Sequence, residues 1–198
     1  MPVTPECLGK NVFQAILARR SVRAYKPDKL SQSTIKTLLE AAVRAPTSMH
    51  EEPWAFVVVQ DERLLKLISD HAKPIFLEEM RHSNSEEIRH SFEHITKPDF
   101  NIFYDAFTLI IICAKPLGQF IAADCWLAAE NLMLAACEMG LGSCVIGSAV
   151  STLNIRTIKS ELGIPEAYYA IAPIIVGVPN GETAATERKE PLILAWKH

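Results

Sequence analysis

Arg19-Arg20-Ser21-Val22-Arg23 places three guanidinium groups and one hydroxyl within five residues. A second run, Ala45-Pro46-Thr47-Ser48-Met49-His50-Glu51-Glu52-Pro53-Trp54, follows later in the chain. Arginine binds phosphate through paired hydrogen bonds, and a serine hydroxyl offers a further donor. Cations at a helix end also offset its exposed carbonyl groups, and the arginine segment (residues 19–23) taken alone fits that structural role better. The two runs in this order point to a binding site.

The chain between the two runs predicts an amphipathic helix. Ser31 suits the N-cap position, Leu30 can pack on Ile35, and apolar residues recur at helical spacing until Pro46 closes the helix. Residues 55–59 are β-branched, aromatic or small and predict a buried strand. Further elements are predicted along the chain: a short helix around 64–68, a strand at 107–113, a helix at 120–139 ending at Gly140, a short strand or turn at 142–147, a helix at 154–162, and a strand at 169–178 broken by Pro173.

The mixture of long helices and few strands predicts an α+β or α/β sandwich around one small sheet. The chain has no stretch typical of a linker, and its length suffices for one well-buried domain, so we expect a single domain over residues 1–198. Residues from about 74 to 105 are highly charged and contain three histidines, and we interpret them as a variable insertion. The glycines at 140–147 have the wrong spacing for a dinucleotide-binding loop.

Composition argues against several functions. A net charge of −3 and a pI near 6.1 are not typical of nucleic-acid binding. We expect no signal peptide and no membrane span, since the apolar runs fall far short of the ~20 residues that a span needs. Five cysteines without a Cys-x-x-Cys pair are typical of a reducing, cytoplasmic environment. His90 and His94 have the spacing of two zinc ligands, but solvated helices often carry such pairs, and we predict no metal.

Four segments in this order resemble the nitroreductase family of flavin mononucleotide (FMN) oxidoreductases: Arg19-Arg20-Ser21, then Ala45-Pro46-Thr47-Ser48 with Pro53-Trp54, then residues 124–147, then Arg188-Lys189-Glu190-Pro191. The resemblance spans nearly the whole chain. It implies an α+β, nitroreductase-like fold with a mixed central sheet flanked by helices, assembled as an intertwined homodimer. It also implies FMN at each subunit interface, NAD(P)H as reductant and a small-molecule electron acceptor, with neither nucleic acid nor membrane as a partner.

The resemblance assigns residues to the cofactor and names no protein acid, base or metal ligand. Arg19 and Ser21 would hold the flavin phosphate and ribityl end, with Arg20 beside them. Arg188 and Lys189 would reach the same phosphate from the C-terminal tail.

The partner subunit would line the isoalloxazine ring with one loop, through Pro46, Thr47, Ser48 and His50. The family's usual pattern has asparagine where His50 stands and glutamine where Glu52 stands. Neutral histidine donates and accepts with a different geometry from asparagine, and an ionised glutamate only accepts. His50 either contacts the flavin or is a loop histidine beside a solvated glutamate.

A third segment would pass the reacting face of the ring with its backbone N–H groups near N5 and O4: Val145, Ile146, Gly147 and Ser148. Gly147 would let the main chain come close to the ring. The alternative interpretation of this segment is a tight turn after Cys144.

We therefore expect an FMN-dependent NAD(P)H oxidoreductase that passes hydride through flavin N5 to an acceptor such as a nitroaromatic or a quinone. The residues at positions 50 and 52 leave open a second hypothesis, a flavin-binding or regulatory protein with little turnover. Specialised flavin chemistry on the same fold, such as dehalogenation or flavin fragmentation, is a third.

Overall fold

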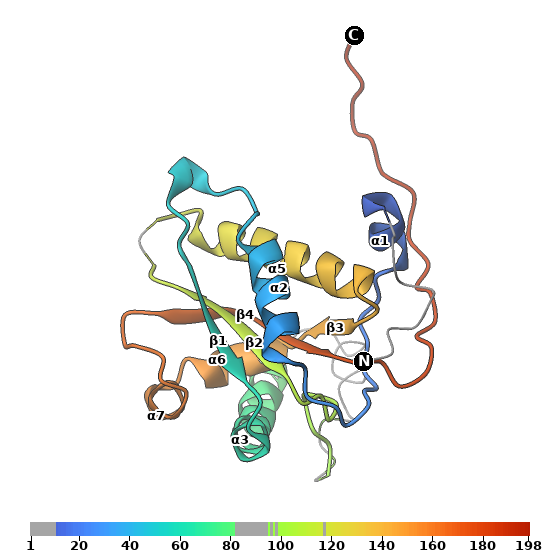
Figure 1. The fold of residues 1–198 in the computed structure, drawn as a ribbon. Coiled ribbons are helices and arrows are strands. Elements are labelled where there is room, and N and C mark those ends of the chain that lie inside the picture. Colours follow the sequence, from blue (N-terminus) through green and yellow to red (C-terminus); the bar gives the residue numbers. More distant parts are fainter. Residues whose placement is uncertain (1–10, 82–94, 96, 98, 117) are drawn as a thin grey trace.

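A computed structural model describes residues 11–81, 95, 97, 99–116 and 118–198 (Figure 1). Its helices are α1 (Val12–Ala18), α2 (Gln32–Ala42), α3 (Glu62–Arg81), α5 (Ile121–Glu138), α6 (Val150–Leu153) and α7 (Arg156–Glu161). Its strands are β1 (Trp54–Val59), β2 (Leu109–Ala114), β3 (Gly142–Val145) and β4 (Tyr169–Gly177). Two short 3-10 helices are also present, η1 (Ser48–His50) and η3 (Gly147–Ala149).

A four-stranded sheet with the order β1-β2-β4-β3 forms the centre of the molecule. Each neighbouring pair is antiparallel. The expected mixed sheet is thus corrected to an antiparallel one in the described strands, because the chain runs in opposite directions in each pair of neighbours. A parallel pairing occurs as a single bridge between Ser21 and Ser143, beside β3.

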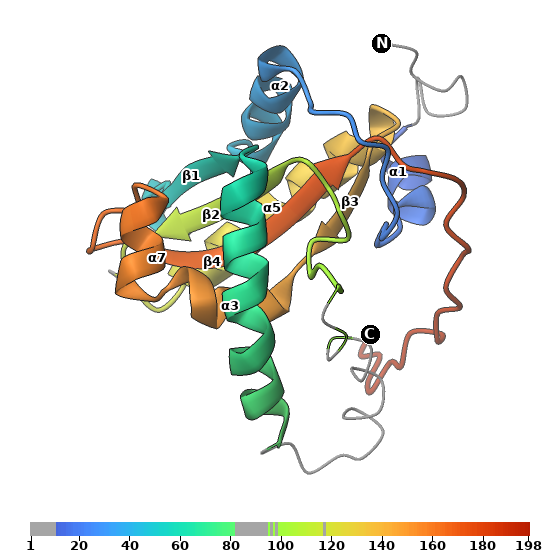
Figure 2. The ribbon, with the colours of Figure 1, turned by 90° about the horizontal axis from the view of Figure 1, so that it is seen from below.

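Helices cover both faces of the sheet (Figures 1 and 2). One core lies under α2 and α5 and includes Ile110 and Ile112, and the other lies under α3, α6 and α7 and includes Leu109 and Ile111. Successive residues of a strand point to opposite faces, so the fully buried strand β2 contributes alternately to both cores. Burial of each such side chain contributes about 1.5–3 kcal/mol, and β2 is therefore central to stability.

The ends of α2 and α5 lie close to their predicted positions. Ser31 caps α2, and its Oγ accepts a hydrogen bond from the Thr34 N–H at 3.1 Å. Leu30 and Ile35 are both buried in the core under α2. Gly140 follows α5 with a φ of 74°, the left-handed conformation that favours glycine after a helix.

Two prolines lie inside elements that continue past them, contrary to the prediction from the sequence. Pro74 lies inside α3, which continues well beyond the short helix expected around 64–68. Pro173 lies inside β4, which is continuous. The Pro173 carbonyl accepts a hydrogen bond from the Ile146 N–H, on the side where β3 has ended. In an antiparallel sheet the N–H and the C=O of one residue point toward the same neighbouring strand. The missing N–H of Pro173 would therefore also point past the end of β3, and no strand residue loses a hydrogen bond.

The insertion predicted at about 74–105 remains a prediction in its extent, because several of its residues lie outside the described part. Its first residues continue α3, and Phe103 near its end is fully buried in the core under that helix. His90 and His94 lie outside the described residues. Within the described ranges, no group of three or more His, Cys, Asp or Glu side chains is arranged to hold a metal ion.

The described cysteines are free thiols: Cys113, Cys125, Cys137 and Cys144. Burial raises the pKa of Cys113 to about 11 and that of Cys125 to about 12, so both stay neutral at physiological pH. In the part of the chain that the structure describes, the helices are too short or too polar to cross a membrane.

Candidate functional site

The arginine segment is extended and lies beside β3. Ser21 pairs with Ser143, whose carbonyl accepts a hydrogen bond from the Val22 N–H at 3.0 Å. Gly142 permits this approach, since a Cβ there would come within 2.7 Å of the Val22 side chain. The buried Tyr25 donates its hydroxyl to the Val22 carbonyl at 2.8 Å. These contacts fix the segment within one chain.

Three side chains of the arginine segment influence the pKa of the Cys144 thiol. Alternate side chains of an extended backbone share one side, which groups Arg19, Ser21 and Arg23. Burial raises the pKa of the Cys144 thiol, whereas Arg23, a hydrogen bond with Ser21, and Arg19 lower it. Two guanidinium groups and a hydroxyl on one side of an extended segment provide donors suited to an anion such as phosphate.

Arg19 and Arg20 play different local roles. The Nε atom of Arg19 lies 3.7 Å from Oε1 of Glu130 on α5, and the arginine side chain is 20% exposed. Arg20 donates from Nη1 to the carbonyl oxygens of Leu17 at 2.6 Å and of Arg19 at 2.8 Å. Arg20 thus satisfies carbonyl groups at the end of α1. Both arginines border a small cavity of about 180 Å³ that reaches the start of the C-terminal tail at Gly181.

A second cavity, of about 310 Å³, includes all four residues of the predicted segment Val145–Ser148. Its other walls come from the arginine segment, α3, residues 95–104 and β3: Arg23, Phe76, Ile95, Phe100, Ile102, Tyr104 and Cys144. A Cβ on Gly147 would meet no atom within 4 Å, so the main chain at this glycine borders open space. The geometry suits a flat ligand that lies against residues 145–148.

Part of this main chain is already engaged. The Ile146 N–H donates to the Pro173 carbonyl at 2.9 Å, and Val145 pairs with Ile174 in the sheet. No partner is found for the N–H groups of Gly147 and Ser148 within the described part of the chain. Of the predicted segment, these two donors are therefore the ones available to a ligand.

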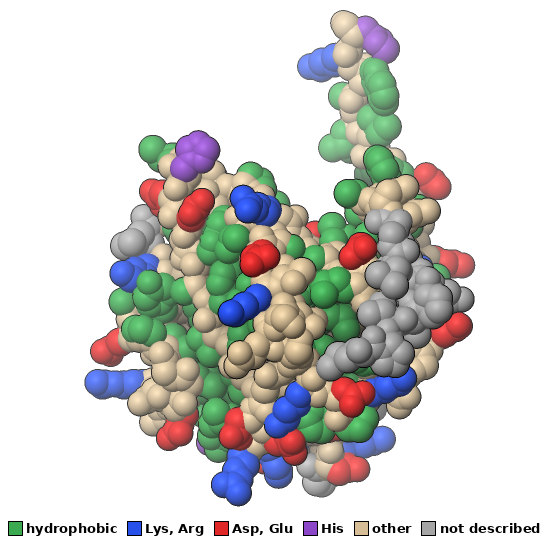
Figure 3. Space-filling model, viewed as in Figure 1, with side chains coloured by type: hydrophobic (Ala, Val, Ile, Leu, Met, Phe, Trp, Pro, Cys, Tyr) green, Lys and Arg blue, Asp and Glu red, His purple; other side chains and the backbone are tan. Residues whose placement is uncertain are grey.

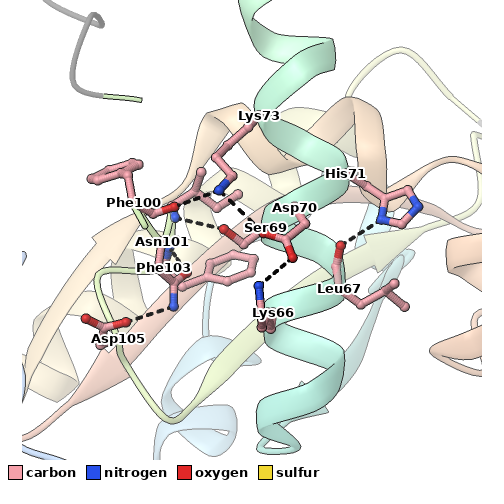
Figure 4. Close-up of polar contacts among 11 residues, drawn as sticks. Lys66, Leu67, Ser69, Asp70, His71, Lys73, Phe100, Asn101, Phe103 and Asp105 are labelled. Atoms are coloured by element: carbon pink, nitrogen blue, oxygen red, sulfur yellow. Dashed lines mark hydrogen bonds and ion pairs between the residues drawn. The ribbon is translucent and has the colours of Figure 1, made fainter. Parts of the chain in front are cut away.

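The aromatic wall of the cavity is held in place by α3 (Figure 4). The Ser69 Oγ accepts a hydrogen bond from the Ile102 N–H at 3.1 Å, and Lys73 Nζ donates to the Phe100 carbonyl at 3.1 Å. The Phe100 ring packs edge-to-face on Tyr104, with 5.5 Å between centroids. Two hydrogen bonds therefore join the wall to α3.

Arg23 is the site residue that the sequence analysis left out of its assignments. Its guanidinium carbon lies 5.8 Å from the centroid of the Tyr104 ring, a cation–π contact inside the cavity. Tyr104 and Asp105 have left-handed backbones, with φ of 51° and 57°, and Asn101 Nδ2 donates to Asp105 Oδ1 at 3.0 Å across that turn. The signal was present in the sequence, because Arg23 follows Ser21 by two positions in an extended segment.

The predicted loop at residues 46–50 (the 46–50 loop) lies near the first turn of α5, whereas α1 lies near its last turn (Figure 1). The Ser48 N–H is within 3.3 Å of both carboxylate oxygens of Asp124, in the first turn of α5. Helix α1, which immediately precedes the arginine segment, contacts Cys137 in the last turn of α5. Arg19 of the arginine segment itself reaches Glu130, about 9 Å along α5 from Asp124 at about 1.5 Å per residue. Within the described residues, no hydrogen bond or ion pair joins the 46–50 loop to the arginine segment.

The C-terminal tail extends away from the body of the molecule (Figures 1 and 3). Arg188 and Lys189 lie on it and are exposed. Leu192, Leu194 and Trp196 are 86%, 89% and 72% exposed. Exposed apolar side chains grouped in this way are typical of a surface that another protein covers.

Known proteins match most of the chain. A family model described as the nitroreductase family matches residues 16–178. A nitroreductase from Bacteroides fragilis, whose crystal structure holds FMN, is 29% identical with a TM-score of 0.76 and covers 92% of this chain and 95% of that one. A protein of Archaeoglobus fulgidus with the assigned name NADH dehydrogenase/NAD(P)H nitroreductase is 29% identical over 89% of this chain and 87% of its own. The iodotyrosine deiodinase of Thermotoga neapolitana is 24% identical over 93% of this chain and 97% of its own.

Proposed function

The chain belongs to the nitroreductase family of flavin oxidoreductases, and we propose that it is an FMN-dependent enzyme that transfers hydride from NAD(P)H to a small acceptor such as a nitroaromatic or a quinone. The observation that carries this proposal is the cavity along Val145–Ser148, which the arginine segment borders through Arg23. FMN consists of a phosphate joined to a flat ring system, and it needs an anion site next to a flat cavity.

Arg19 and Ser21 are suited to the FMN phosphate, which carries close to two negative charges. The 3.7 Å contact from Arg19 to Glu130 is long, so the guanidinium keeps donors for a phosphate. Arg20 already uses Nη1 at the end of α1, and we assign its contribution to its backbone. Arg188 and Lys189 would add positive charge from the tail, whose start borders the small cavity beside Arg19.

The ring system would lie in the larger cavity, against residues 145–148. Gly147 and Ser148 offer the N–H groups for its N5 and O4 edge, and Arg23 offers a positive charge beside it. Phe100 and Tyr104 supply an apolar wall that excludes water from one side. When bound, FMN supplies the acceptance and donation of hydride at N5. The protein's part is to bind, orient and exclude water, and we assign no acid or base.

We infer a homodimer in which the partner's 46–50 loop completes each site. In the described part of the chain, no hydrogen bond or ion pair joins this loop to the arginine segment, which supports the inference. So do the exposed apolar side chains of α1, of the loop and of the tail, including Phe13, Met49 and Trp196. An obligate interface of this kind would bury more than ~2,000 Å² in total.

The absorbance spectrum of purified protein tests the proposal. Protein that carries FMN is yellow, and anaerobic addition of NADPH, with NADH in parallel, should bleach the flavin band within seconds. Colourless protein that stays so after incubation with FMN would contradict the proposal. Bleaching that fails over minutes would favour the alternative of a flavin-binding protein with little turnover.

The iodotyrosine deiodinase relative supports one further candidate, the reductive removal of a halogen from an aromatic ring. This candidate uses the same FMN site and differs in the acceptor. Products from nitroaromatics, quinones and halogenated phenols, measured with the same reduced protein, separate the possibilities.

A further inference from the structure

The chain around the 46–50 loop has an unusual backbone. Met49, His50 and Glu52 have φ values of 53°, 55° and 43°, a left-handed region that residues other than glycine rarely adopt. Such conformations persist where the surrounding structure enforces them, and they concentrate at functional sites. Strand β1 fixes the far end of this stretch from Trp54 onward. Its near end needs an anchor of its own.

Asp124 supplies that anchor. Its carboxylate is 4% exposed, and both of its oxygens lie 3.3 Å from the Ser48 nitrogen. The first turn of α5 is a favourable place for a negative charge, because the helix dipole stabilises it. Taking a carboxylate out of water is nevertheless costly, and a well-packed apolar residue often serves stability at least as well. The specific contribution of the carboxylate is to accept the hydrogen bond from the Ser48 N–H.

We propose that Asp124 is a positioning residue for the cofactor, which holds the 46–50 loop in the shape that meets the partner's flavin. This role rests on the proposed function, because the flavin is the ligand that the loop would contact. Asp124 takes the Ser48 N–H, and the hydroxyls of Thr47 and Ser48 have no partner among the described residues. Both hydroxyls therefore remain for the ligand, while Asp124 acts through the loop.

Three variants of Asp124 test the proposal in the full-length protein. Asp124→Ala removes the acceptors, Asp124→Leu removes them while filling the volume, and Asp124→Asn keeps one acceptor oxygen. In FMN-free protein, amide hydrogen exchange over residues 46–52 should be faster in the Ala and Leu variants than in the wild type. The dissociation constant for FMN should rise by about tenfold to a hundredfold, the range for loss of a charged hydrogen bond. Asp124→Asn should recover part of both effects.

Glu161→Gln is the matched control, because it removes an exposed carboxylate from α7 on the opposite face of the sheet (Figure 1). It should change neither measurement. Folded Ala or Leu variants with wild-type exchange and wild-type FMN affinity would overturn the proposal, and Asp124→Leu decides it if Asp124→Ala does not fold. A wild-type protein that binds no FMN would defeat the proposed function instead, while faster exchange in the variants would still establish the anchor.

Discussion

The arginine segment and the 46–50 loop belong to one proposed site, but the chain treats them differently. Several contacts within the chain hold the arginine segment. It forms a backbone hydrogen bond with β3, Gly142 makes room for Val22, and Tyr104 packs on Arg23. The loop has a defined shape as well, yet it leaves Met49 86% exposed. In the proposed dimer, one half of the site would be complete within a subunit, and the other half would need a second subunit.

Removal of residues 190–198 should have the largest effect. The deleted stretch carries large apolar side chains that are 59–89% exposed, and we expect them to be buried against the partner. Dimer content and FMN occupancy should therefore fall together, as measured by light scattering and by flavin absorbance. A truncated protein that stays a dimer with full flavin would show that the tail packs on its own subunit.

Arg19→Ala tests the half of the site that one chain completes. Loss of a charge-assisted pair costs about 1.5–3 kcal/mol, so FMN affinity should fall about tenfold to a hundredfold. Arg20→Ala is the neighbouring control and should weaken FMN binding less, because the Arg20 side chain serves the end of α1. Both titrations need the same salt concentration, since screening weakens charge pairs. Equal affinities of Arg19→Ala and wild type would remove Arg19 from the phosphate site.

Gly142→Ala and Gly147→Ala should separate stability from binding. A Cβ at position 142 would overlap Val22 at 2.7 Å, so the free energy of unfolding in urea should fall by about 1–3 kcal/mol. A Cβ at position 147 meets no protein atom within 4 Å, and stability should stay within about 0.5 kcal/mol of wild type. FMN affinity should nonetheless fall in Gly147→Ala, because the methyl group enters the ligand's space. Unchanged affinity there would place the ring elsewhere.

His50→Asn should have the smallest effect. Asparagine tolerates the left-handed backbone at this position (φ of 55°) better than most residues and matches the family's usual pattern. Thermal stability should be equal or slightly higher, and FMN affinity should be kept or improved. Abolished binding in a folded variant would reveal a specific role of the histidine.

Local patterns in the sequence predicted most of the fold. The Ser31 cap, the spacing up to Pro46 and Gly140 after α5 each act within a few residues, and all three are confirmed. The course of α3 through Pro74 and of β4 through Pro173 could not be predicted in this way. Whether the absent N–H of a proline leaves a hydrogen-bond acceptor without a partner depends on the residue opposite it, and tertiary structure sets that neighbour.

The site was predicted unevenly for a similar physical reason. Residues 145–148 are consecutive and line one cavity, and their position beside the flavin ring stays a prediction. Arg23 required the alternation of an extended segment to be applied to residues 19–23. The resemblance marked Asp124 only as the start of the segment 124–147, because its role depends on Ser48, far away in the sequence. The proposed contribution of the 46–50 loop to a partner's flavin would be a property of two chains, and periodicity within one chain does not contain it.

A heterodimer of two defective subunits tests the shared site most directly. One subunit carries Arg19→Glu, which reverses a charge of the arginine segment, and the other carries Ser48→Trp, which blocks the 46–50 loop. Each homodimer should lack FMN. If each site combines the arginine segment of one subunit with the loop of the other, the purified heterodimer has one intact site and should bind one FMN per dimer. If both parts serve a flavin within the same subunit, every site carries one defect, and a heterodimer without flavin would contradict the account.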